Sequence, residues 1–175
     1  MPWELAAVAV DEQLNAGESP GDYVCRVARL KALAACARVS EGIVVAADTT
    51  VALDAEIFAK PVDLADCRRM LGALGGRTHS VYTGVVVAGG GRIDSALSRS
   101  EVSFRMLAPA EIDAYWASGE PRDKAGGYAI QGLGAAFIRE LRGSYSGVMG
   151  LPLFETAQLL KGFGLDVLQP AEARS

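Results

Sequence analysis

The sequence predicts an α/β fold in which helices flank an elongated mixed β-sheet around a central cleft. Helical and extended patterns alternate along the 175 residues, as is typical of a sheet covered by helices. Two extended runs on either side of Gly89-Gly90-Gly91 predict a hairpin, so we expect antiparallel pairs within the sheet. A chain of this length is expected to form one domain over residues 1–175.

Local signals place each element in order. Ser19 as N-cap, Pro20 in the first turn and Asp22 two residues later predict a helix that runs to about Val39. The apolar, β-branched run Ile43–Ala47 predicts a short buried strand. The remaining predictions are a helix over Asp63–Leu74 with Asp63 as its cap, strands over Ser80–Ala88 and Ile93–Met106, a helix over Pro109–Ala117, a strand over Ala135–Leu141, a helix over Pro152–Lys161 and a strand over Leu165–Leu168.

Composition excludes several classes of protein. Half of the residues are hydrophobic and 22% are charged, which is ordinary for a globular protein, and no apolar run approaches the ~18 residues that span a membrane. The net charge of −4 argues against a nucleic-acid-binding surface. Cys25, Cys36 and Cys67 show no metal-type spacing, which predicts reduced thiols in the cytoplasm. A single histidine, His79, excludes a multi-histidine metal site, and we expect it to be a buried, hydrogen-bonded side chain.

One glycine-rich stretch, Gly119–Gly134, has the composition of a loop built around a nucleotide. Glycine lets the backbone approach a ligand closely, Lys124 supplies a point charge suited to phosphate, and the amide of Gln131 offers a donor beside an acceptor. A glycine-rich turn between two strands is an equally good interpretation of the composition alone.

Asp48 is the strongest candidate for chemistry. The sequence places it just past the C-terminal end of the strand over Ile43–Ala47, where open α/β sheets bind ligands. A carboxylate there can accept a proton from water or hold a divalent cation. The alternative is an ordinary turn or cap aspartate, which is the role we assign to nearby Asp54.

Three lysines at separate positions are candidates for binding phosphate. Lys31 lies seven residues after Val24 on an apolar helical stripe, where a lysine is unusual unless its charge has a partner or its tip extends to solvent. Lys60 precedes a proline that fixes the local chain, and Lys124 lies in the glycine-rich stretch. In an acidic protein, three cations gathered in one cleft would attract an anionic substrate.

Several short motifs, in this order, resemble the Maf family of nucleoside triphosphate pyrophosphatases from about Asp11 to about Leu165. The motifs are ARLKA at Ala28–Ala32, AADTTV at Ala46–Val51, AKP at Ala59–Pro61, GRTHSVYTGV at Gly76–Val85, and GSYSGVMGLPL at Gly143–Leu153, together with the glycine-rich stretch. The resemblance implies a fold similar to that of inosine-triphosphate pyrophosphatase. It also implies a homodimer that removes non-standard or excess pyrimidine nucleotides.

The resemblance also implies roles for individual residues. Asp48 matches the catalytic base of the family, and Glu12 matches an acidic position near the phosphates, so the two are expected to hold Mg²⁺ or Mn²⁺. Lys31, Lys60 and Lys124 match lysines that hold the triphosphate. Thr78 is a further candidate hydrogen-bond donor to the substrate, although it is also an ordinary strand residue.

Gln131 and Thr49 point to one branch of the family. A glutamine amide can accept from N3–H and donate to O4 of uracil or thymine, whereas a carboxylate suits the donor pair of a guanine. The branch that hydrolyses dTTP and UTP resembles this chain in both residues, and the 7-methyl-GTP branch carries glutamate in place of Gln131. A loop amide that binds backbone is the alternative role for Gln131.

The chain departs from the family pattern at its beginning. A strand and a phosphate-binding loop that read approximately Ser-x-Ser-Pro-Arg-Arg open Maf-like chains, whereas Met1–Glu4 here aligns with the second strand. We therefore expect an open sheet edge. Either the start codon is assigned too late or the chain is a truncated form. The alternatives to a dTTP/UTP pyrophosphatase are a pyrophosphatase for 7-methyl-GTP or another modified purine, and a catalytically inactive nucleotide-binding or interaction protein.

Overall fold

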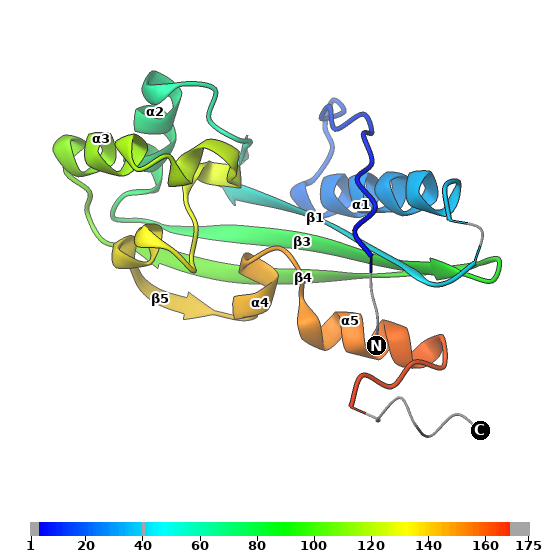
Figure 1. Cartoon of the computed structure of the whole chain (residues 1–175). Coiled ribbons are helices and arrows are strands. Elements are labelled where there is room, and N and C mark those ends of the chain that lie inside the picture. Colours follow the sequence, from blue (N-terminus) through cyan, green and yellow to red (C-terminus); the bar gives the residue numbers. More distant parts are fainter. Residues whose placement is uncertain (1–3, 40, 169–175) are drawn as a thin grey trace.

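A five-stranded sheet with the strand order β2-β1-β3-β4-β5 forms the centre of the computed structural model, which describes residues 4–39 and 41–168. All four pairs of neighbours are antiparallel, so the sheet lacks the parallel pairs of a mixed sheet. Helices flank the sheet, which is elongated along its two longest strands, as predicted (Figure 1). The strands are β1 (Val44–Leu53), β2 (Glu56–Phe58), β3 (Thr78–Gly89), β4 (Arg92–Phe104) and β5 (Ile138–Arg142).

The hairpin of β3 and β4 runs along the length of the sheet (Figure 1). The two strands pair without interruption from Thr78↔Ser103 to Gly89↔Arg92. Gly90 and Gly91 close the hairpin with φ angles of 57° and 77°, a region that glycine enters without steric cost. The hairpin predicted at the three consecutive glycines is therefore confirmed.

β1 extends further than the sequence predicts. It runs over Val44–Leu53 and pairs with β3 from residue 44 to residue 52. Asp48 lies in the middle of this strand, opposite Gly84 of β3, so the prediction that it follows the end of the strand is wrong. Pairing with β3 carries the strand through the polar residue, and the β-branched Thr49 and Thr50 favour the same extended backbone.

The outer edge of β1 is open beside Asp48. β2 pairs only with Val51, Ala52 and Leu53, and no other strand among residues 4–39 and 41–168 lies along this edge. The predicted open sheet edge is therefore found. Of the expected strand over Met1–Glu4, residues 1–3 lie outside the described residues, and residues 4–18 contain no helix or strand.

Helix α1 (Pro20–Cys36) packs closely on β1 and β3. It begins as predicted, because the Ser19 hydroxyl accepts a hydrogen bond of 3.2 Å from the Asp22 amide. A Cβ at Gly84 would lie 2.7 Å from the carbonyl oxygen of Val24, so only glycine allows the helix this close to the sheet. The small apolar core between helix and sheet contains Ala28, Ala32, Val86 and Ala88.

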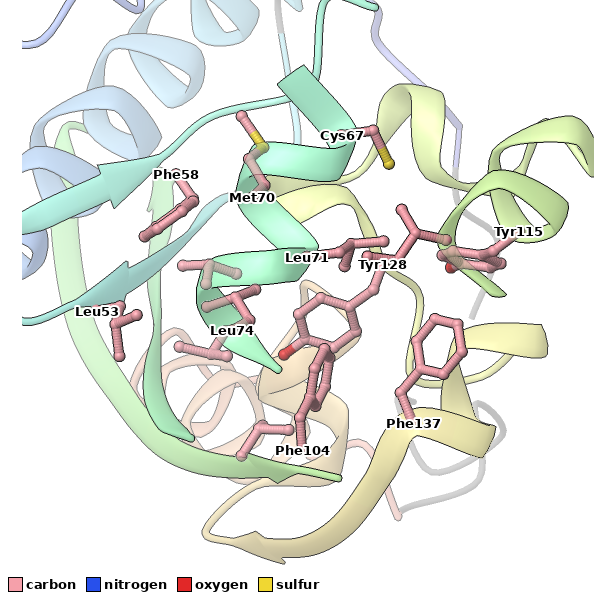
Figure 2. Close-up of a cluster of buried hydrophobic side chains, with 14 residues drawn as sticks. Leu53, Phe58, Cys67, Met70, Leu71, Leu74, Phe104, Tyr115, Tyr128 and Phe137 are labelled. Atoms are coloured by element: carbon pink, nitrogen blue, oxygen red, sulfur yellow. The ribbon is translucent and has the colours of Figure 1, made fainter. Parts of the chain in front are cut away.

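A larger apolar core fills the space between the sheet and two further helices, α2 (Leu64–Leu74) and α3 (Pro109–Ala117). Both helices confirm the predictions, and Asp63 caps α2 by accepting a hydrogen bond of 2.8 Å from the Asp66 amide. Figure 2 shows Phe104, Tyr115, Tyr128 and Phe137 near one another in this core, with Phe104 beside Tyr128 at 4.8 Å between ring centroids. Each fully buried large side chain stabilises the fold by roughly 2 kcal/mol.

The polypeptide between α3 and β5 contains short 3-10 helices separated by turns: η1 (Glu120–Asp123), η2 (Ala125–Gly127) and η3 (Leu133–Phe137). The strand predicted over Ala135–Leu141 therefore begins only at Ile138, where pairing with β4 starts, and ends at Arg142. The apolar run Ala135–Ile138 crosses the boundary, so the sequence pattern does not distinguish the 3-10 helix from the strand that follows.

Two helices, α4 (Tyr145–Val148) and α5 (Leu153–Gly162), complete the fold, and α5 confirms the predicted helix. The strand predicted over Leu165–Leu168 is wrong, because that segment pairs with no strand of the described sheet and Leu168 is 90% exposed. None of the helices in the described part of the chain has the length and apolar character needed to cross a membrane.

His79 of β3 is buried in the larger core, with 2% of its surface exposed. Its Nε2 lies 2.8 Å from the Tyr128 hydroxyl, whereas Nδ1 has no hydrogen-bond partner among the described residues. The expected buried histidine is found, with one of its two ring nitrogens hydrogen-bonded. Burial lowers the pKa of His79 to about 4, so the ring is neutral at neutral pH.

We expect the free energy of unfolding to decrease as the pH falls from about 6.5 to about 4. In this window the unfolded His79 binds a proton and the folded His79 does not, so acid favours the unfolded state, by roughly 3 kcal/mol in full. Urea unfolding at several pH values measures this slope. A His79→Phe variant should lose this part of the slope, and an unchanged slope in that variant would contradict the low pKa.

Candidate functional site

An ion pair between helix α1 and strand β1 forms one half of the site. Lys31 Nζ lies 2.7 Å from Asp48 Oδ1, and the side chains are 23% and 10% exposed. Lys31 follows Val24 by two helical turns, so it lies on the helix face that packs against the sheet. The lysine on the apolar stripe therefore has the charged partner that its position requires.

Glu12 joins this pair from the segment that precedes α1. Its Oε1 lies 2.8 Å from Lys31 Nζ, so Lys31 bridges two carboxylates. The segment is fixed to the helix by the Tyr23 hydroxyl, which donates to the Glu12 carbonyl at 3.0 Å, and by Arg26, which donates to the Gln13 carbonyl at 2.8 Å. The two acidic residues that the sequence suggests for a metal ion are thus brought together.

Burial changes the acid–base properties of the pair. Burial raises the pKa of Asp48 above its ordinary value, and this effect exceeds the opposing effect of the hydrogen bond and charge of Lys31. Burial by itself lowers the pKa of Lys31, but the hydrogen bonds to Asp48 and Glu12 outweigh it and raise the pKa. Lys31 is therefore a firmly charged cation beside a carboxylate that accepts a proton more readily than an exposed aspartate does.

A cavity of about 230 Å³ adjoins Asp48 and forms the other half of the site. Both Lys60 and Lys124 line it, so three of the five predicted cation and carboxylate positions border one space. β1, the segment Asp123–Tyr128 and the turn after α4 supply most of its wall. The lining residues are Ala47, Asp48, Thr49, Val51, Lys60, Val81, Asp123, Lys124, Ala125, Tyr128, Val148, Met149 and Gly150.

The glycine-rich stretch holds the two cavity lysines near each other. The Gly126 amide donates to the Ala59 carbonyl at 3.0 Å, which ties the loop after Lys124 to the residue before Lys60. Gly126 has a φ of 69°, and a Cβ there would lie 2.9 Å from a methyl group of Val51, so glycine is required on both counts. Gly126 is thus required by close packing within the protein, and the approach of this stretch to a ligand stays a prediction.

Thr49 lies on the cavity wall and belongs to a chain of hydroxyl groups. Its Oγ1 is 2.8 Å from Thr83 Oγ1, and the Thr83 hydroxyl donates to the Gly147 carbonyl at 2.7 Å. Strand residues alternate between the two faces of a sheet, so Asp48 points toward α1 and Thr49 toward α4. Figure 1 shows α1 and α4 on opposite sides of the sheet.

Two candidate residues lie apart from this cavity. Thr78 is the first residue of β3, six residues before Gly84, which corresponds to about 20 Å along a strand. It shares a hydrogen bond of 2.7 Å with Ser103 and borders a separate polar cavity. Gln131 is exposed in a turn and is not among the lining residues, so its role in recognition stays a prediction.

The cavity wall also includes residues for which no individual role was predicted from the sequence. Asp123 binds Lys124 Nζ at 2.8 Å, and Tyr128, Met149 and Gly150 complete the wall. The dipeptide Asp-Lys was a usable signal for the ion pair. Tyr128 belongs to the glycine-rich stretch, and Met149 and Gly150 belong to the motif over Gly143–Leu153. The sequence therefore marked these segments, but which of their residues face the cavity depends on tertiary contacts.

The described residues contain no cluster of three or more histidine, cysteine, aspartate or glutamate side chains suited to a metal ion. Glu12 and Asp48 are a two-carboxylate set. Mg²⁺ is commonly held by one or two carboxylates that share it with substrate phosphates and water. The pair therefore has the donor chemistry for such an ion, with the remaining ligands supplied from outside the protein.

Comparison with known proteins assigns the chain to a group of enzymes. The family model described as Maf-like protein matches residues 1–163. A dTTP/UTP pyrophosphatase of Methylococcus capsulatus is 53% identical over 166 residues, which cover 94% of this chain and 82% of the relative. One of Sphingopyxis alaskensis is 52% identical over 94% of this chain and 87% of its own length. A nucleoside triphosphate pyrophosphatase of Xylella fastidiosa is 51% identical over 93% and 88%.

We expect a Lys31→Met variant to raise the pKa of Asp48 further. The substitution removes the hydrogen bond and the charge that lower this pKa, and burial remains. A pH titration of the Asp48 carboxyl carbon by NMR measures the change. Lys161→Met, an exposed position in the last turn of α5, is the matched control and should leave the titration unchanged. A lower pKa in Lys31→Met would contradict the assignment.

Proposed function

The chain belongs to the Maf family, and from that membership we propose that it hydrolyses dTTP and UTP to the monophosphate and pyrophosphate. The observation that carries the proposal is the position of Asp48. This largely buried carboxylate is hydrogen-bonded to Lys31 and borders a cavity that is also lined by Lys60 and Lys124. A proton acceptor beside several cations is what hydrolysis of a triphosphate requires.

Asp48 acts as the general base in this proposal. It removes a proton from a water molecule as the water oxygen bonds to the α-phosphorus, and the bond from that phosphorus to the bridging oxygen breaks to release pyrophosphate. The raised pKa of Asp48 suits this step, because a more basic carboxylate accepts a proton more readily. Lys31 keeps the carboxylate oriented through its 2.7 Å hydrogen bond.

The remaining residues bind the substrate. Lys60 and Lys124 hold the phosphate groups in the cavity, with Lys31 beside them, and Thr49 contacts the nucleoside. Gln131 selects the base in this proposal, which requires its exposed turn to close over the bound nucleotide. Thr78 is left out, because it lies at the far end of β3.

A divalent cation, Mg²⁺ or Mn²⁺, would be held by Glu12 and Asp48. The fit rests on the two carboxylates that share the Lys31 ammonium at 2.8 and 2.7 Å. When bound, the cation would offset the negative charge of the phosphates and of the leaving group.

We also propose that the protein acts in the cytoplasm as a homodimer. The absence of metal-type or paired cysteine spacing supports the compartment, since Cys25, Cys36 and Cys67 are all free. Four nearby apolar side chains after α4 support an interface, because they are 38–71% exposed: Met149, Leu151, Leu153 and Phe154.

Replacement of the base tests the reaction. An Asp48→Asn variant should lose about 10²–10⁴-fold in turnover of dTTP, because the amide cannot accept the proton. Asp54→Asn is the matched control: Asp54 lies in the turn between β1 and β2 with a φ of 54°, which asparagine also tolerates. Pyrophosphate release from dTTP, UTP, CTP, GTP and 7-methyl-GTP, with Mg²⁺ or Mn²⁺, is the measurement.

The same panel decides among the functions. Turnover of dTTP and UTP supports the proposal, and preference for 7-methyl-GTP would replace it with the modified-purine alternative. Thermal stabilisation by nucleotide without hydrolysis would indicate an inactive binding protein. Full turnover in Asp48→Asn would exclude Asp48 as the base.

A Gln131→Glu variant tests the base-selecting residue. The carboxylate cannot donate to O4 of a pyrimidine, so we expect kcat/KM for dTTP to fall at least about tenfold, the value of one hydrogen bond. The exposed Gln158 of α5 supplies the control variant Gln158→Glu, which should leave kcat/KM unchanged. Equal kcat/KM in wild type and Gln131→Glu would show that Gln131 does not contact the base.

A further inference from the structure

The hydroxyl groups of Thr49 and Thr83 form a chain whose direction is fixed by its last member. Thr83 Oγ1 lies 2.7 Å from the carbonyl oxygen of Gly147, which can only accept a hydrogen bond. A threonine hydroxyl has one hydrogen, so Thr83 donates its only hydrogen bond to Gly147. Thr83 is 1% exposed, and solvent does not offer it another partner.

The direction of the second hydrogen bond follows from the first. Thr49 Oγ1 and Thr83 Oγ1 lie 2.8 Å apart, so one of them must donate to the other. Because Thr83 has already used its hydrogen, Thr49 is the donor. The Thr49 oxygen is left with lone pairs and no hydrogen for any further contact.

These lone pairs have room for a ligand on the cavity side. Thr49 lines the cavity, and Gly150 lies across from its hydroxyl. A Cβ added at Gly150 would lie 3.7 Å from Thr49 Oγ1, an ordinary van der Waals contact, so the absence of a side chain at Gly150 leaves the cavity side of this oxygen uncovered. Gly147 is itself fixed, because its amide donates to Ser144 Oγ at 2.9 Å within α4.

We propose that Thr83 is a positioning residue that makes Thr49 a pure hydrogen-bond acceptor toward the cavity, and that this selects an imide N–H of the substrate base. The inference rests on the proposed function. Thymine and uracil present N3–H as a donor, whereas cytosine presents a lone pair at N3. In this arrangement Thr49 accepts from N3–H, and Gln131 keeps only the contact with O4. Because the Thr49 hydroxyl cannot rotate to donate, its oxygen accepts a hydrogen bond from N3–H of thymine or uracil. With cytosine, the lone pair of this oxygen would face the lone pair of N3.

Substitution of Thr83 tests the proposal through a ratio. The quantity is kcat/KM for dTTP divided by kcat/KM for dCTP, measured on the same protein preparation. A Thr83→Val variant lacks the acceptor for Thr49, whose hydroxyl can then turn and donate to cytosine. We expect the ratio to fall by about tenfold, the discrimination of one hydrogen bond. Thr83→Ser keeps the hydroxyl and should keep the wild-type ratio.

A double-mutant comparison tests whether Thr83 acts through Thr49. Thr49→Val should lower the ratio by itself, and adding Thr83→Val to it should cause no further change. The ratio does not depend on how much of the preparation is folded, so loss of stability at the buried Thr83 does not imitate the effect. If Thr83→Val does not fold, the same ratio is compared between Thr49→Val and Thr49→Ser. The valine variant should lower the ratio, and the serine variant should keep the wild-type value.

If Thr83→Val lowers kcat/KM for dTTP and for dCTP by the same factor, the proposal is overturned, and the Thr49–Thr83 hydrogen bond has only a structural role. Equal losses in Thr49→Val would overturn it as well, because they would indicate that the substrate donor is a sugar hydroxyl common to both nucleotides. Failure of the proposed function is a different result, since the wild-type protein would then release pyrophosphate from neither nucleotide.

Discussion

The contact of helix α1 with Gly84 is the constraint on which the site depends. Gly84 faces Asp48 across the β1–β3 ladder, and the backbone of Val24 occupies the space where a side chain at position 84 would lie. This close contact sets the distance between helix and sheet, and two turns further along the helix it places Lys31 over Asp48. A larger residue at position 84 would move the helix outward, and the ion pair would lose its geometry together with the small core around Ala28.

Because side chains alternate along a strand, the neighbouring residues Asp48 and Thr49 lie on opposite faces of the sheet. Asp48 meets the charged groups beside α1, and Thr49 meets the hydroxyl chain and the cavity beside α4. A shift of one residue in the pairing of β1 with β3 would exchange these two side chains. The long ladder of β1 with β3 and the helix packed on Gly84 both oppose such a shift. The proposed catalytic role of Asp48 and the proposed base recognition by Thr49 therefore depend on the same register of β1 with β3.

The parts of the structure that could be predicted are those specified by local signals. Ser19 and Asp63 start helices by capping, and consecutive glycines close a hairpin, so these elements appear where the sequence places them. The position of Asp48 inside a strand could not be predicted, because pairing with β3 carries the strand through a polar residue. A lysine on an apolar stripe correctly indicated a charged partner for Lys31. The role of Thr83 needed the fold, since its partners are 34 and 64 residues away.

The charges of the site are largely compensated before a substrate arrives, and the three lysines differ in how firmly they are held. Lys31 is bound to two carboxylates and partly buried, so it stays with Asp48 as an orienting cation. Lys124 is paired with Asp123, whose side chain is 71% exposed, and such a pair is worth at most about 1 kcal/mol. Lys60 has no carboxylate within ion-pair distance in the described part of the chain. Lys60 and Lys124 can therefore turn to phosphate at little cost. The two carboxylates on Lys31 would still repel the substrate, and this repulsion is a physical argument for the divalent cation in the proposed reaction.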